Sequence, residues 1–143
     1  MPWESRAQGA KDEASLRVVV ADSSAVVLRE LVSLLSTEFQ VGGTAITGTE
    51  VLQLIHQSQP DVAVISLRLP ELNGIEVIRQ LVKEERHPAV VVCSFETSPE
   101  IIEASYNAGA LGYVLKTRAA VDLVAAVRAA AVGKRFQSPS SAE

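Results

Sequence analysis

The stretch Val62-Ala63-Val64-Ile65-Ser66 is typical of a buried strand, because four consecutive apolar residues are followed directly by a polar one. Three further runs have the same form: Val18-Val19-Val20-Ala21 before Asp22, Val90-Val91-Val92-Cys93 before Ser94, and Tyr113-Val114-Leu115 before Lys116. Short continuous runs rich in β-branched residues are typical of strands buried on both faces, as in a parallel sheet covered by helices. The carboxyl ends of such strands lie along one edge, where ligand sites form. We therefore expect the four polar residues to converge.

Helix signals separate the strands and give five consecutive strand-then-helix units. The expected strands are 18–21, 41–46, 62–65, 89–93 and 111–115. The expected helices begin at Ser23 or Ser24, at Thr49, after Pro70, at Ser98 and near residue 119. Serine is a preferred capping residue, and proline is favoured at the first position of a helix, as in Ser98-Pro99. Short loops and right-handed crossovers then predict an α/β fold, a doubly wound five-stranded parallel sheet with helices on both faces.

The length of 143 residues suits one folded domain between two tails. Residues 1–15 are polar and without periodicity, and we interpret them as a disordered tail. The domain itself is expected to span residues 16–132. Residues 133–143 contain Gly133, Pro139 and several serines and charged side chains, and they are interpreted as a linker-like C-terminal tail.

Composition and charge exclude several classes of protein. The net charge of −4 argues against direct binding of nucleic acid, which needs a basic surface. No apolar segment approaches the roughly 18 residues that span a membrane, and the first residues lack the apolar core of a signal peptide. The single cysteine, Cys93, excludes an intrachain disulfide and lies in a valine run typical of a buried thiol. These features indicate a cytoplasmic protein.

Several motifs, in order along the chain, resemble those of the receiver domain of two-component response regulators. They are Asp22, the run Ser66-Leu67-Arg68-Leu69-Pro70-Glu71-Leu72-Asn73-Gly74, Ser94, and Gly112-Tyr113-Val114-Leu115-Lys116. The resemblance covers roughly residues 17 to 132 and implies the flavodoxin-like fold of receivers. Residues 107–116 are especially similar to the NarL-like branch, whose members carry a helix-turn-helix output domain. No helix-turn-helix pattern follows residue 132 in this sequence.

The chemistry implied by the resemblance needs residues that this chain has replaced. Receivers accept a phosphoryl group on an aspartate after the third strand, where this chain has Ser66. They also carry two acids after the first strand, where this chain has Asp22 and Ser23. Three carboxylates and one lysine leave two net negative charges for Mg²⁺ to neutralise, whereas Asp22 with Lys116 leaves none. We therefore expect Mg²⁺ binding to be lost. Because a serine hydroxyl is a poor nucleophile without an adjacent base, we also expect aspartyl phosphorylation and enzymatic activity to be lost.

The remaining motif residues have both a signalling and a structural interpretation. Ser94 resembles the hydroxyl that receivers move toward phosphate, and Tyr113 resembles the aromatic side chain coupled to that movement. Without a phosphoryl group, Ser94 is expected to hydrogen-bond locally and Tyr113 to pack near the last helices. Asp22 and Lys116 are expected to form a partly buried ion pair between two strand ends.

We expect a pseudo-receiver that acts in signal transduction or transcriptional regulation as a protein-binding or dimerisation module. Its partner, or a second copy, would dock on the last strand and the last two helices. The residues suggested for a homodimer in the helix over 119–132 are Val121, Val124, Ala125 and Val127. Two alternatives stay open: a phosphotransfer receiver with residual or non-aspartate phosphorylation, and a small-ligand sensor that uses the rebuilt acidic pocket.

Overall fold

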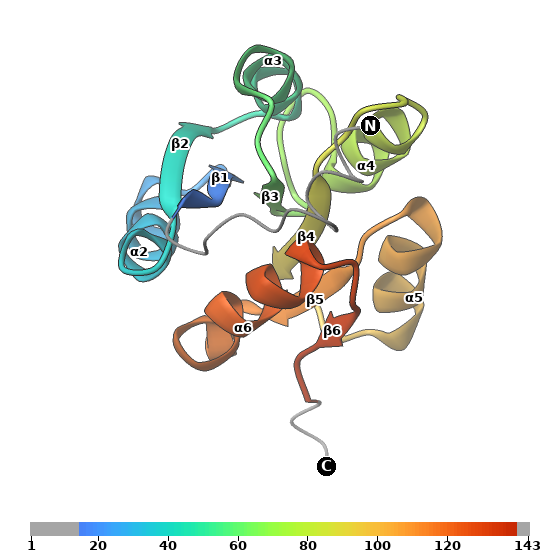
Figure 1. Cartoon of the computed structure of the whole chain (residues 1–143). Helices are drawn as coiled ribbons and strands as arrows, with labels where there is room; N and C mark the ends of the chain where they lie inside the picture. Colours follow the sequence, from blue (N-terminus) through green and yellow to red (C-terminus); the bar gives the residue numbers. More distant parts are fainter. Residues whose placement is uncertain (1–14, 140–143) are drawn as a thin grey trace.

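A six-stranded parallel sheet runs through the centre of the protein, with helices on both faces (Figure 1). The computed structural model describes residues 15–139. Its strands are β1 (Arg17–Ala21), β2 (Gln40–Ala45), β3 (Val62–Ile65), β4 (Ala89–Ser94), β5 (Gly112–Leu115) and β6 (Phe136–Gln137). Its helices are α2 (Ala25–Ser36), α3 (Gly48–Ser58), α4 (Gly74–Val82), α5 (Pro99–Ala108), the 3₁₀ turn η2 (Lys116–Arg118) and α6 (Ala119–Ala131). The predicted α/β, doubly wound architecture is confirmed.

The strand order is β2-β1-β3-β4-β5-β6, and each neighbouring pair is parallel. The chain first winds outward from β1 to β2, then crosses back over β1 to β3 and continues in the opposite direction. Winding therefore reverses between β1 and β3, and sheets of this kind bind ligands at the carboxyl ends of the strands beside such a reversal. Asp22 and Ser66 follow these two strands directly.

Two apolar layers explain why the strand sequences are continuously hydrophobic. Helices α2 and α6 cover one face of the sheet, while α3, α4 and α5 cover the other (Figure 1). In β1, Val18 and Val20 pack in the layer with α2 and α6, whereas Val19 and Ala21 pack in the opposite layer. Successive side chains of a strand point to opposite faces, so a strand covered on both sides must be apolar at every position.

Side-chain caps define where the helices begin. Ser24, Thr47, Asn73 and Ser98 each accept a hydrogen bond from the backbone amide three residues later. Such bonds satisfy one of the amides that the first turn of a helix leaves without a partner. The prediction of Thr49 as a helix start was one residue late, because Thr47 is the cap and α3 begins at Gly48.

The sheet has one strand more than the five predicted. Strand β6 lies in the segment interpreted as linker-like and pairs with β5 at the sheet edge. The amide of Phe136 donates to the carbonyl of Leu111 at 3.1 Å, and that of Ser138 donates to the carbonyl of Tyr113 at 2.9 Å. A two-residue edge strand carries no hydrophobic periodicity, so the pattern that predicts the other strands could not predict it.

The tail assigned to residues 1–15 lies, except for Ser15, outside the described residues. Within residues 15–139, no helix combines the length and the apolar character needed to cross a membrane.

Candidate functional site

The structure brings three of the four strand-end residues together around one ammonium group. Lys116, directly after β5, places its Nζ 2.6 Å from Oδ2 of Asp22, which follows β1. The same Nζ donates to Oγ of Ser66, after β3, at 3.4 Å. Ser94, at the end of β4, is turned toward its own loop, where its Oγ accepts from the amide of Glu96 at 3.1 Å. The predicted convergence is therefore present for Asp22, Ser66 and Lys116, whereas Ser94 forms its hydrogen bond within its own loop.

Asp22 and Lys116 form a buried ion pair. The side chain of Asp22 is 2% exposed and that of Lys116 10% exposed. Oδ1 of Asp22 accepts from the amide of Ser24 at 2.9 Å. Oδ2 receives no hydrogen bond of good angle from the described residues, so its contact with Lys116 is a close charge–charge contact rather than an aligned hydrogen bond. This carboxylate thus depends on one ammonium for its compensation.

Phe95 covers the ammonium from the solvent side. Its ring centroid lies 5.0 Å from Nζ of Lys116. Phe95 is 63% exposed, so it lies at the mouth of the site. A cation over an aromatic face is attracted by the negative face of the ring. Lys116 is therefore held by a carboxylate, a hydroxyl and a ring together.

Among residues 15–139, the structure shows no base in hydrogen-bond contact with the hydroxyl of Ser66. The residue is 4% exposed. Activation of a serine needs a neighbouring base that removes its proton. The neighbour of Ser66 is the ammonium of Lys116, which donates to the hydroxyl and is itself paired with Asp22. A donor in an ion pair cannot take a proton, so the hydroxyl stays neutral.

A second ion pair joins the loops above the site, and the sequence analysis missed it. Nε of Arg68 donates to Oε2 of Glu96 at 3.0 Å, and Nη2 contacts the same oxygen. Arg68 lies two residues after Ser66, and Glu96 lies two residues after Ser94. The hydrogen bond and the charge of Glu96 raise the pKa of the Arg68 guanidinium above its ordinary value. A search of the positions just after each strand end for opposite charges would have found this pair.

Ser23 and Tyr113 attach to these same loops. Oγ of Ser23 donates to the carbonyl of Arg68 at 3.5 Å, a long contact at an exposed position. Tyr113 is fully buried in the layer with α3, α4 and α5, and its hydroxyl donates to the carbonyl of Glu96 at 2.9 Å. Burial raises the pKa of this phenol above its ordinary value. Glu96 is thus held through its backbone by Tyr113 and through its side chain by Arg68.

The donor set at the site does not fit a divalent metal. Mg²⁺ takes six oxygen ligands in a near-ideal octahedron and usually needs at least one free carboxylate. Asp22 already compensates Lys116, and the neighbouring side chains from the other strand ends are serine hydroxyls. Among residues 15–139, no group of three His, Cys, Asp or Glu side chains is placed to hold a metal ion.

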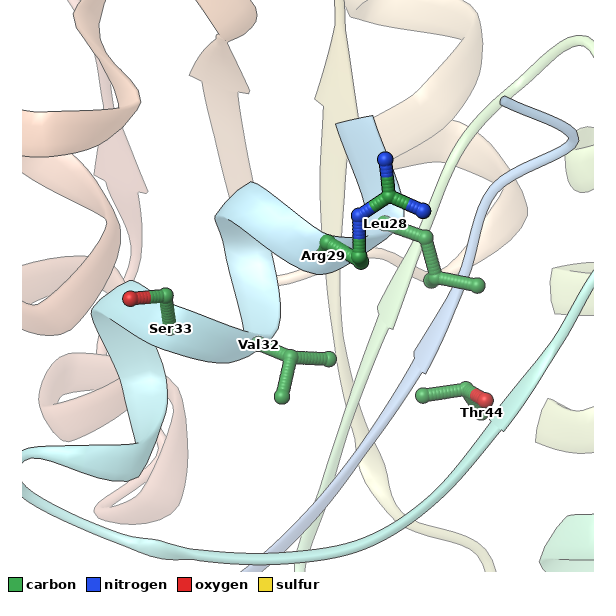
Figure 2. Close-up of a pocket in the computed structure, with 5 residues that line it drawn as sticks. All are labelled: Leu28, Arg29, Val32, Ser33 and Thr44. Carbon is green, nitrogen blue, oxygen red and sulfur yellow. The ribbon is translucent and has the colours of Figure 1, made fainter. Parts of the chain in front are cut away.

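A separate groove of about 430 Å³ lies between α2 and β2, and Figure 2 shows the residues that line it. It is lined by Leu28, Arg29, Val32 and Ser33 of α2 and by Thr44 of β2. None of these residues belongs to the strand-end site, so this groove is not a rebuilt form of the acidic pocket.

Comparison with known proteins now identifies the family, because residues 18–128 match the model of the response regulator receiver domain. The chain belongs to this family. Within it, the receiver domain is 35% identical over 121 residues to the DNA-binding transcriptional activator DevR/DosR of Mycobacterium tuberculosis, covering 83% of this chain and 56% of that protein. It is 33% identical over 126 residues to the uncharacterized transcriptional regulatory protein YvfU of Bacillus subtilis, covering 87% and 63%. This receiver domain thus spans 56–63% of the length of these two relatives.

Solved structures agree with the fold and with the branch. The signal receiver domain of the putative response regulator NarL from Mycobacterium tuberculosis has 31% identity and a TM-score of 0.80, with 84% of this chain and 98% of that chain covered. A two-component response regulator of the LuxR family from Aurantimonas sp. SI85-9A1 has 26% identity and a TM-score of 0.82, with 87% and 91% covered. The chain therefore contains a receiver domain of the NarL/LuxR-type branch, and its family acts in two-component signal transduction and transcription regulation.

Proposed function

We propose that this receiver domain signals without aspartyl phosphorylation, as a pseudo-receiver that binds a protein partner or a second copy. The observation that carries the proposal is the 2.6 Å pair between Asp22 and Lys116. The family pattern combines one lysine with two acids after the first strand and an accepting aspartate after the third. Here Ser66 stands in place of the accepting aspartate and Ser23 in place of the second acid, and the lysine compensates the remaining acid.

The Asp22–Lys116 pair also supports the proposal that the domain stays in a single conformation. A ligand shifts a conformational equilibrium only by its differential affinity for the two states. Lys116 already has its carboxylate, Tyr113 is buried, and Ser94 is bonded in its loop. These contacts support the proposal, because the charges of Asp22 and Lys116 already compensate each other. Under this proposal, control comes from protein contacts on the surface of the domain.

The contact surface proposed from the sequence needs one correction in α6. Val127 is fully buried against the sheet, in the same layer as Leu123 and Ala130, because positions three and four apart share one helix face. It cannot contribute to a dimer, and Val124 is half-buried. The exposed side of this helix carries Val121, which is 70% exposed. Contact through α6 would therefore use Val121 and its exposed neighbours.

A metal titration with a restored variant tests the proposed loss of acidic chemistry. We expect no saturable binding of Mg²⁺ or Mn²⁺ below millimolar concentrations by calorimetry or by Mn²⁺ relaxation. The variant with both Ser23→Asp and Ser66→Asp supplies the two missing carboxylates, and metal binding should return. Binding by the unaltered protein with sub-millimolar affinity would rule out the proposal.

A further inference from the structure

Strand β6 is held by a buried polar cluster that the site described above does not use. Oγ of Ser138 donates to Oδ2 of Asp122 at 2.7 Å and accepts from the amide of Leu115 at 3.1 Å. Nε of Arg118 donates to the same Oδ2 at 2.8 Å. Ser138 is 4% exposed and Asp122 6% exposed. We call these four groups, the Leu115 amide and the side chains of Arg118, Asp122 and Ser138, the Ser138 latch.

The Leu115 amide, the Ser138 hydroxyl and both carboxylate oxygens of Asp122 each have a hydrogen-bond partner, so the buried polar atoms of the latch form one connected network. Burial alone would raise the pKa of Asp122, but the hydrogen bonds from Arg118 and Ser138, together with the charge of Arg118, hold it below its ordinary value. Loss of the Ser138 hydroxyl would leave the buried Leu115 amide without its acceptor. An unsatisfied buried amide costs more than the net value of the bond that it loses.

The latch and the strand-end site share one short piece of chain. Residues 115–118 cover the end of β5 and the whole of η2. Within this piece, Lys116 reaches Asp22 and Ser66, while the amide of Leu115 and the side chain of Arg118 reach the latch. A displacement of the backbone at Lys116 would therefore reach both the Asp22 contact and the two latch contacts.

Two more contacts fix the outgoing chain between α5 and α6. The hydroxyl of Tyr106 donates to the carbonyl of Phe136 at 2.6 Å. The guanidinium of Arg135 lies 4.0 Å from the centroid of the Tyr106 ring. Figure 1 shows β6 beside β5, with α5 on one side of it and α6 on the other. The direction in which the chain passes Ser138 is thus set by contacts to β5, α5 and α6.

We propose that the Ser138 latch is the output device of this domain, through which residues 115–118 couple the strand-end site to the chain that continues from β6. The inference rests on the proposed function, because it explains how a domain without a phosphoryl switch could control the position of β6 and of the chain that follows it. With the Asp22–Lys116 pair intact, the latch is closed and β6 is docked. Disruption of that pair opens the latch and frees β6.

Amide hydrogen exchange of the whole chain by NMR tests this coupling. Ser138→Ala should speed exchange of the Leu115 and Ser138 amides about five- to tenfold, as expected for the loss of about 1 kcal/mol. Gln137→Ala is the matched control, because this neighbouring side chain is exposed and its strand pairing uses only the backbone. It should leave the same amides within twofold of the unaltered protein.

The decisive experiment alters the Asp22–Lys116 pair and measures amide exchange at β6 and Ser138. Asp22→Asn combined with Lys116→Met removes the pair without stranding a charge, and it should speed exchange of the Ser138 and Phe136 amides at least threefold, beyond any change at the buried β3 amides. By reciprocity of coupling, Ser138→Ala should shift the NMR resonances of Lys116 and Ser66. Unchanged exchange at Ser138 in the double variant, or unshifted site resonances in Ser138→Ala, would overturn the inference. Failure of the proposed function is a different result, since it would appear as metal binding or a phosphoryl adduct in the unaltered protein.

Discussion

Replacing Lys116 by methionine should cost about 3 kcal/mol of unfolding free energy. The two charges lie 2.6 Å apart, and at an effective dielectric constant of about 20 their attraction is about 6 kcal/mol before any desolvation. Burial of both ions offsets part of this gain, and removal of one partner from a buried pair costs about 3–5 kcal/mol. The lower end applies, because Asp22 keeps its bond from the Ser24 amide and Lys116 is 10% exposed.

Denaturation by urea, followed by far-ultraviolet circular dichroism, measures this cost in a double-mutant cycle. Adding Asp22→Asn to Lys116→Met removes the stranded charge, so the double variant should recover about 2 kcal/mol of the loss. Lys134→Met is the matched control at an exposed lysine and should change stability by less than about 0.5 kcal/mol. A cost below about 1 kcal/mol for Lys116→Met, or no recovery in the double variant, would refute the view that this pair holds the site.

Three further predictions concern other parts of the domain. Glu71 has a φ of 70°, a conformation that favours glycine, so Glu71→Gly should raise the free energy of unfolding by about 0.5–1 kcal/mol while Glu71→Ala should not, as measured by urea denaturation. Burial raises the pKa of the Cys93 thiol to about 12 from 9.0, so the native thiol should resist an aromatic disulfide reagent at pH 8 and react only after denaturation. Because the unfolded thiol loses its proton near pH 9 while the folded thiol keeps it, the free energy of unfolding should fall from about pH 9 toward pH 12. Cys93→Ala should remove that fall. Any self-association through α6 detected by sedimentation velocity should weaken in Val121→Asp and be unaffected by the exposed Gln137→Ala, and equal association of all three proteins would exclude this helix surface.

Sequence reasoning predicted the parts of the fold that depend on hydrophobic pattern. Continuous apolar runs such as 62–65 require burial on both faces, and this fixes a parallel sheet and the edge at which Asp22, Ser66 and Lys116 meet. The structure places Lys116 against both of the others, as the prediction of a pair between strand ends requires.

What sequence reasoning missed depends on side-chain direction and backbone pairing. The Arg68–Glu96 pair joins two loops that are far apart in sequence, and no local pattern gives the direction of either side chain. Strand β6 is held by backbone bonds and by Ser138, which carry no periodic signal. In α6, the helix is apolar or alanine on nearly every side, so its sequence did not decide that Val127 faces the sheet.

Intact mass spectrometry after incubation with acetyl phosphate and Mg²⁺ tests whether this receiver domain can be phosphorylated. We expect the unaltered protein to keep its mass, because Ser66 is buried, is bonded to an ammonium and contacts no base among the described residues. The variant with Ser23→Asp and Ser66→Asp, treated in parallel, supplies the carboxylates and shows whether the conditions suffice for phosphorylation. A stoichiometric gain of one phosphoryl group on the unaltered protein would contradict the account.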